Sequence, residues 1–137
     1  MTETNQSTLE TSREADQSLS LAEFSEALPE IASEIQEFAE AREWAQFHTP
    51  RNIVLALMGE VGELAELLQW KGDDIFEKDD EDPVRAKISA ETLDKLSHEL
   101  ADVSIYLLRL CTVCDLVEPV AQALLRFDEA ASSPSNL

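Results

Sequence analysis

The sequence contains 137 residues with 29 acidic and 10 basic side chains, which gives a formal net charge of -19. This length allows one domain with a single core, and so acidic a chain is poorly suited to bind a nucleic-acid backbone or an anionic membrane surface. Because the chain contains only 3 Gly and 5 Pro, it has little material for the turns of an all-β fold, and helices are expected.

The first 18 residues are rich in Thr, Ser, Glu and Gln and contain almost no large apolar side chain. Burial of such a segment cannot offset the entropy lost on ordering it. We therefore predict a disordered leader over 1–18, a single helical domain over 19–131 and a flexible tail over 132–137. No signal-peptide pattern and no apolar run of membrane-spanning length is present, so we expect a soluble, cytoplasmic protein.

The first helical signals lie directly after this leader. Ser20 and Glu23 have capping-box spacing, and Pro29 is typical of the first turn of a helix. These signals predict a short helical turn followed by a long helix from about 28 to 45. Its buried stripe is expected to consist of Leu28, Ile31, Ile35, Phe38 and Ala45.

Thr49 and Pro50 have the residue types of an N-cap and a first helical position. They predict a second helix that runs to about Lys71, where Gly72 supplies a stop. Its core stripe, with steps of three and four, reads Ile53, Leu57, Glu60, Leu64 and Leu67, so Glu60 occupies a position that the pattern marks as buried. The acidic segment 72–83 is expected to be a solvated loop, because it lacks the spacing of an EF-hand.

The strongest periodicity predicts a third helix from about 84 or 89 to 115. Its stripe reads Leu93, Leu96, Leu100, Val103, Leu107, Leu110 and Cys114. A fourth helix is expected from near Pro119, with Val120, Leu124 and Phe127 on one face. Four helices with short connections predict an all-α, antiparallel four-helix bundle, completed by oligomerisation. Burial is favoured over redox or metal chemistry for Cys111 and Cys114, since their C-x-x-C spacing falls within a helical apolar pattern.

Two predicted helices each carry a pair of acidic residues separated by three positions. Glu60 and Glu63 lie in GEVGELAE (59–66), and Glu99 and Asp102 lie in HELAD (98–102). Residues with this spacing share one helix face. Carboxylates gathered at a helix interface repel one another and are costly to desolvate unless a cation neutralises them. Oxygen ligands favour Mg²⁺, with Mn²⁺ as a substitute, so these four acids are candidate metal ligands.

Other interpretations of the same acids remain open. Glutamate pairs occur on many solvated helices, and spacing alone favours that interpretation over a metal site. Glu66 continues the pattern but is expected to lie outside the first set of ligands. A di-iron bundle is disfavoured, because neither His48 nor His98 has a Glu three residues before it.

Three blocks around these residues resemble the MazG-type all-α nucleoside triphosphate pyrophosphohydrolases, most closely their dCTP pyrophosphatase branch. The blocks are EWAQFHTPRN (43–52), LALMGEVGELAELLQWK (55–71) and ELADVSIYLL (99–108). The resemblance implies Mg²⁺ ligation by Glu60, Glu63, Glu99 and Asp102. It also implies a nucleotide pocket formed by Trp44, Ala45, Gln46, Phe47, His48, Trp70 and Tyr106. From the residues alone, the aromatic side chains are more often packing residues than base-stacking ones.

The sequence departs from the family pattern at two places. Ile35 stands where related enzymes can carry a polar or histidine contact to the base, and the segment after Leu124 lacks the family's usual Lys and Asn pattern. Arg126 is a candidate substitute for that lysine. These departures bear on substrate choice and on contacts to the phosphates.

The resemblance implies Mg²⁺-dependent hydrolysis of a nucleoside triphosphate to the monophosphate and pyrophosphate. A pyrimidine deoxynucleotide such as dCTP is the favoured substrate, and Glu60 and Glu63 are the expected catalytic acids, with Glu63 orienting or deprotonating the attacking water. The alternative is a catalytically silent helical dimerisation or scaffold module with the same fold. Both hypotheses predict a homo-oligomer, a dimer or a dimer of dimers, without nucleic-acid or membrane partners.

Overall fold

A computed structural model of the chain describes residues 20–76 and 88–132. The described part is all-helical, as the sequence predicted, with four α-helices and one short 3-10 helix. The elements are α1 (Leu21–Ala41), η1 (Trp44–Gln46), α2 (Pro50–Leu68), α3 (Ala90–Val113) and α4 (Val117–Ser132). The predicted leader, most of the predicted tail and the second half of the acidic loop lie outside the described residues.

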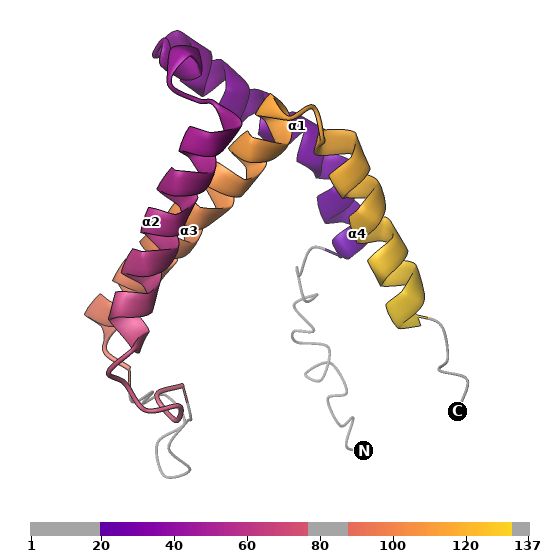
Figure 1. Cartoon of the computed structure of the whole chain (residues 1–137). Helices are drawn as coiled ribbons and strands as arrows, with labels where there is room; N and C mark the ends of the chain where they lie inside the picture. Colours follow the sequence, from indigo (N-terminus) through magenta and orange to yellow (C-terminus); the bar gives the residue numbers. More distant parts are fainter. Residues whose placement is uncertain (1–19, 77–87, 133–137) are drawn as a thin grey trace, which may run out of the picture.

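The helices form two antiparallel pairs (Figure 1). Helix α2 packs along α3, and α1 packs along α4. The two pairs meet where α1 crosses the C-terminal part of α3, and from there they diverge. No helix in the described ranges is long and apolar enough to cross a membrane.

The predicted start signals at Ser20 and at Thr49 are confirmed. Ser20 forms a complete capping box with Glu23 at the start of α1, and the Thr49 hydroxyl accepts a hydrogen bond from the backbone N–H of Asn52 at the start of α2. Ser89, which was not singled out from the sequence, caps α3 in the same way through the N–H of Thr92, so α3 begins at the later of the two predicted starts. Each cap satisfies an N–H group that has no partner within its own helix.

The predicted limits of the first helix are wrong at both ends. Helix α1 starts at Leu21 and continues through Pro29, although an interior proline removes one backbone hydrogen bond and its ring crowds the carbonyl four residues earlier. Buried residues on both sides of Pro29, Leu28 and Ala32, hold the helix against the rest of the chain there. The helix ends at Ala41 rather than near 45, because Glu43 adopts a left-handed conformation with φ of 56°.

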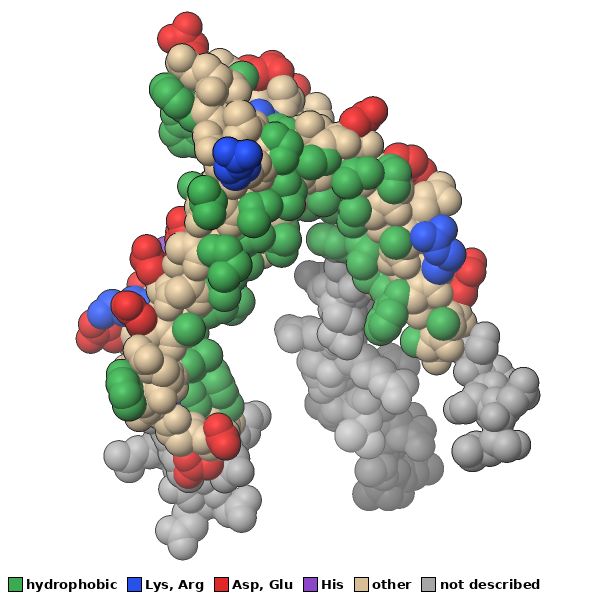
Figure 2. Space-filling model, in the orientation of Figure 1, with side chains coloured by type: hydrophobic (Ala, Val, Ile, Leu, Met, Phe, Trp, Pro, Cys, Tyr) green, Lys and Arg blue, Asp and Glu red, His purple; other side chains and the backbone are tan. Residues whose placement is uncertain are grey.

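Only part of the predicted stripes is buried within one chain. Ile53 and Leu96 are buried between α2 and α3, and Leu28, Ala32 and Ala39 are buried on α1. Several predicted core residues are exposed, among them Phe38, Leu93, Leu100, Leu107 and Phe127. Figure 2 shows hydrophobic side chains gathered along the inner side of the angle between the two helix pairs. Cys111 and Cys114 are free and half-buried.

Candidate functional site

The predicted acidic residues meet across the α2–α3 pair. Glu60, Glu99 and Asp102 each present a carboxylate oxygen, and these three atoms lie within 4.8 Å of one another. Glu60 and Glu99 are half-buried, whereas Asp102 is exposed. The antiparallel packing of α2 on α3 aligns the middle of the two helices. Glu60 therefore lies beside Glu99 and Asp102, although they are 39 or more positions away in the sequence.

Electrostatic repulsion marks these acids as one cluster. The pKa of Glu60 is raised, first by its burial and then by the negative charges of Asp102, Glu63 and Glu99. Glu63 stands outside the tight group of three but is close enough to contribute to this shift. In the described part of the chain, no Lys or Arg forms a salt bridge with any of the four acids. The cluster therefore offers several oxygen ligands and an excess of negative charge, which is the donor set that a hard divalent cation requires.

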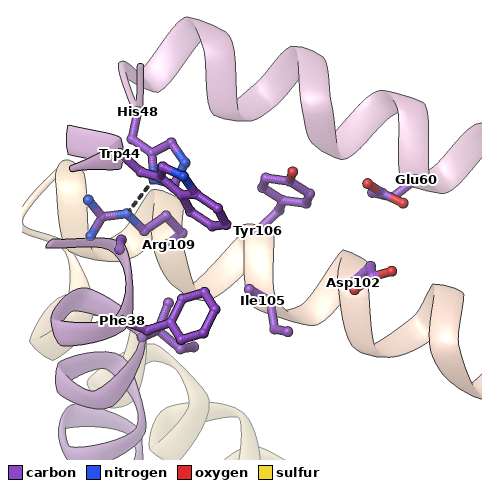
Figure 3. Close-up of a pocket in the computed structure, with 10 residues that line it drawn as sticks. Phe38, Trp44, His48, Glu60, Asp102, Ile105, Tyr106 and Arg109 are labelled. Atoms are coloured by element: carbon purple, nitrogen blue, oxygen red, sulfur yellow. Dashed lines mark hydrogen bonds between the residues drawn. The ribbon is translucent and has the colours of Figure 1, made fainter. Parts of the chain in front are cut away.

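The acidic cluster forms one end of a cavity of about 320 Å³ (Figure 3). Helix α1 contributes Ile35, Phe38 and Ala39 to its lining, and the segment before α2 contributes Trp44 and His48. Helix α3 contributes Asp102, Ile105, Tyr106 and Arg109, and Glu60 comes from α2. A cavity of this size, largely apolar and with a few polar groups, is typical of small-molecule sites.

The polar residues of α3 follow one face of the helix. Glu99, Asp102, Tyr106 and Arg109 are separated by three, four and three positions, so they share one side of the helix. Asp102, Tyr106 and Arg109 line the cavity. In Figure 3, Asp102 and Glu60 lie at one end, Tyr106 lies in the middle, and Arg109 lies with Trp44 and His48 at the other end. The cavity is thus acidic at one end and aromatic at the other.

The aromatic end is built from local packing around Trp44. The rings of Phe38 and Trp44 meet edge to face with centroids 5.6 Å apart, and the Trp44 and His48 centroids are also 5.6 Å apart. The Arg42 guanidinium lies 3.3 Å from the centre of the Phe38 ring, which places a cation over an aromatic face. The backbone carbonyl of Trp44 accepts hydrogen bonds from the N–H groups of Phe47 and His48. These bonds hold the backbone of Trp44 and His48 together, so η1 fixes the positions of their two rings.

The structure brings together some of the predicted pocket residues and not others. Trp44, His48 and Tyr106 line the cavity, whereas Ala45, Gln46 and Phe47 are exposed and do not. Trp70 is 88% exposed and lies ten residues beyond Glu60, about 15 Å along the helix direction. A single chain therefore does not place Trp70 at this cavity.

Sequence reasoning missed Phe38 as a cavity residue and did not single out Ile105 or Arg109. A signal for Arg109 was present, because it continues the spacing of Glu99, Asp102 and Tyr106 within an otherwise apolar run. Ile35, which was identified as a departure from the family pattern, does line the cavity. An apolar side chain therefore stands at this point of the cavity wall.

Comparison with curated proteins supports the resemblance. The chain is 48% identical over 85 residues to dCTP pyrophosphatase 1 of Bos taurus and of Homo sapiens, and 47% identical to that of Mus musculus. The aligned region covers 62% of this chain and 46% of each relative, so the match spans about half the length of these proteins. No protein-family model matches the chain. The resemblance predicted from the three sequence blocks is confirmed: the chain is similar to dCTP pyrophosphatases over most of its length.

Proposed function

We propose that this protein is a Mg²⁺-dependent nucleoside triphosphate pyrophosphohydrolase that cleaves dCTP or a related pyrimidine nucleotide to the monophosphate and pyrophosphate. The observation that carries the proposal is the cavity with a carboxylate cluster at one end and aromatic rings at the other. A nucleoside triphosphate has the matching polarity, with a metal-binding phosphate chain at one end and a flat base at the other. The similarity to proteins named dCTP pyrophosphatase 1 supports this substrate class.

The residues fit a divalent cation. Glu60, Glu99 and Asp102 would hold Mg²⁺, or Mn²⁺ in its place, and Glu63 is proposed to complete the ligand set. When bound, the cation would neutralise phosphate charge and lower the pKa of an attacking water. Glu63 is more exposed than Glu60 and is the acid proposed to orient that water and accept its proton. Without a cation, the acidic cluster and the triphosphate would repel each other.

The aromatic end of the cavity would bind the base. Trp44 and Tyr106 offer ring faces for stacking, and His48 offers a ring nitrogen. Ile35 and Ile105 add apolar surface, which suits a flat ring whose polar groups lie at its edge. Ala45, Gln46, Phe47 and Trp70 would contact the nucleotide only after a further rearrangement or from a second subunit.

A homo-oligomer is part of this proposal. The α2–α3 pair has an exposed apolar stripe on each helix, with Val54, Met58 and Val61 on α2 and Leu93, Leu100 and Leu107 on α3. Helices normally bury such a stripe against another layer. A second copy supplies the same two helices, and a two-fold arrangement would complete a four-helix layer.

The test measures pyrophosphate release from a panel of common and modified nucleoside triphosphates, with Mg²⁺ or with a chelator. We expect Mg²⁺-dependent release, greatest for a pyrimidine deoxynucleotide, and a loss of about 10²-fold or more in kcat for Asp102→Asn and Glu63→Gln. Asp94→Asn is the matched control, since Asp94 is exposed on α3 beside His98 and outside the cluster. Unchanged turnover in Glu63→Gln would exclude its role as the base.

The scaffold hypothesis gives a different result in a binding experiment. Isothermal titration with Mg²⁺ and a non-hydrolysable nucleotide should show metal-dependent binding if the cavity is a nucleotide site. Oligomerisation without any nucleotide binding would instead favour a silent helical module.

A further inference from the structure

Arg109 is the one charged side chain that is buried in the described part of the chain, with 3% of its surface exposed. It lies on α3 among Leu107, Leu108 and Leu110, where an apolar residue would be expected. A guanidinium carries its charge at all ordinary pH values, and burying it is costly unless its N–H groups are satisfied. The groups that form hydrogen bonds with Arg109 therefore indicate its role.

The hydrogen bonds of Arg109 connect three elements. Its Nε donates to Nδ1 of His48 at 2.9 Å, and its Nη1 donates to the side-chain carbonyl of Gln36 on α1. Gln36 in turn donates to the carboxylate of Glu40, one turn further along α1. Burial lowers the pKa of Arg109, and the negative charge of Glu40 opposes this shift by favouring the charged form. This network fixes the guanidinium from the α1 side and directs its Nε–H to His48.

The bond to His48 determines which nitrogen of the imidazole carries the proton. Arginine has donors and no acceptor, so Nδ1 of His48 must accept and must be unprotonated. The proton of the neutral ring then resides on Nε2, which leaves His48 as a hydrogen-bond donor at that atom. Burial and the positive charge of Arg109 both lower the pKa of His48, which favours this neutral form. His48 lines the cavity at the end away from Glu60 and Asp102.

We infer that Arg109 is a positioning residue that fixes His48 as an Nε2–H donor for a carbonyl oxygen on the base of the bound nucleotide. This inference rests on the proposed function, since it assigns the aromatic end of the cavity to the base. An N–H donor selects for an acceptor and against an amino group at the same place on the ligand. Arg109 thus acts on base recognition through His48, at a distance from the acids that would act on the phosphates.

The first test reads the tautomer directly in the free protein. Long-range ¹H–¹⁵N spectra of the labelled chain show which ring nitrogen of each histidine is protonated, and the chain has only 2 histidines. We expect His48 to be a single Nε2–H tautomer, whereas His98, which is exposed and 3.7 Å from Asp94, serves as an internal reference. A mixture of tautomers at His48 in the unmodified protein would overturn the inference, whether or not nucleotides are hydrolysed.

The second test removes the donor. Arg109→Leu should release His48 from its fixed tautomer and raise KM for dCTP by about five- to tenfold, with kcat changed by less than about twofold, because one hydrogen bond to the base would be lost and the acidic cluster kept. Gln36→Leu keeps Arg109 but removes a hydrogen bond that holds it. This variant should loosen the His48 tautomer and raise KM for dCTP, each by less than Arg109→Leu does. Lys95→Leu is the control for the His48 spectrum, since it removes a charge from the same helix at an exposed site.

The outcomes separate this inference from the proposed function. A fixed His48 tautomer in a protein that hydrolyses no nucleotide would refute the function and with it the role in base recognition. Hydrolysis of dCTP with an unchanged KM in Arg109→Leu, after the tautomer has been shown to change, would refute the inference alone. A large fall in kcat together with the rise in KM in Arg109→Leu would also refute the inference, because it would assign Arg109 to the end of the cavity where the phosphates would react.

Discussion

At the scale of single residues, Glu60 combines a core position with a charge. Its place in the stripe of α2 makes it half-buried, and the neighbouring acids of α3 increase the cost of ionising it. A side chain held against such repulsion destabilises the folded protein unless a ligand compensates. The same acids that would bind a metal should therefore reduce stability when no metal is bound.

This repulsion predicts that the effect of Glu60→Gln on thermal stability depends on pH. The pKa of Glu60 is raised in the folded protein above its ordinary value of 4.5, so protonation of Glu60 stabilises the fold below that value, and this contribution is lost as the pH rises through the folded pKa. Glutamine is neutral throughout. In a chelator, we expect Glu60→Gln to raise Tm by a few degrees at pH 7 and to have little effect near pH 4.

Thermal unfolding by circular dichroism across pH 4–8 measures this difference. The same scans with added Mg²⁺ should show a concentration-dependent rise in Tm for the unmodified protein and a smaller rise for the variant, since a ligand that binds only the folded state stabilises it. Asp94→Asn is again the control, because Asp94 lies outside the cluster. Equal Tm values for Glu60→Gln and the unmodified protein at all pH values would show that the acids do not repel one another.

At the scale of helices, the predicted and the observed first helix differ in the position that they give to Pro29. The sequence placed Pro29 in a first turn, where its missing N–H costs nothing. In the structure it lies inside α1, where it removes a hydrogen bond to the carbonyl four residues earlier. The two arrangements give different expectations for the same substitution.

Pro29→Ala should increase the free energy of unfolding by about 1–3 kcal/mol if α1 is continuous, because alanine restores the N–H and has a higher helix propensity. Pro50→Ala is the matched control, since Pro50 is the first residue of α2 and its N–H would have no partner within the helix. Denaturant unfolding measures both variants. If Pro29→Ala were as neutral as Pro50→Ala, the helix would start near residue 28 after all.

The helices also show what the sequence could and could not predict. The Ser20 capping box and the Thr49 cap were readable because each acts on N–H groups within its own first turn. The left-handed Glu43 was not readable, because it has no glycine or asparagine signal. Glu60, Glu99 and Asp102 were found because acids interrupt apolar stripes, but Arg109 was missed, because its partners Gln36 and His48 are 73 and 61 positions away.

At the scale of the whole molecule, the two diverging helix pairs leave much apolar surface exposed (Figure 2). Among the exposed large side chains are Leu55, Met58, Leu100 and Leu107. Leu100 and Leu107 belong to the α3 stripe that was predicted as core, whereas Leu55 and Met58 lie outside the predicted α2 stripe, whose members are buried or half-buried. In the proposed oligomer, a second copy would cover these exposed side chains. The net charge of -19 would oppose such an association through repulsion between copies, so burial of apolar surface would have to outweigh it.

If the proposed oligomer forms through these helices, Met58→Glu should dissociate it. Met58 is 62% exposed on α2, and an ionised carboxylate at a buried interface would weaken association by at least about 10²-fold. Ala101→Glu is the control, because Ala101 is exposed on a face of α3 different from that of Leu100 and Leu107. Light scattering after size-exclusion chromatography measures the mass of each variant. Since salt screens the repulsion between acidic copies, the unmodified protein should associate more strongly as ionic strength rises, and a monomeric mass under all conditions would refute the shared core.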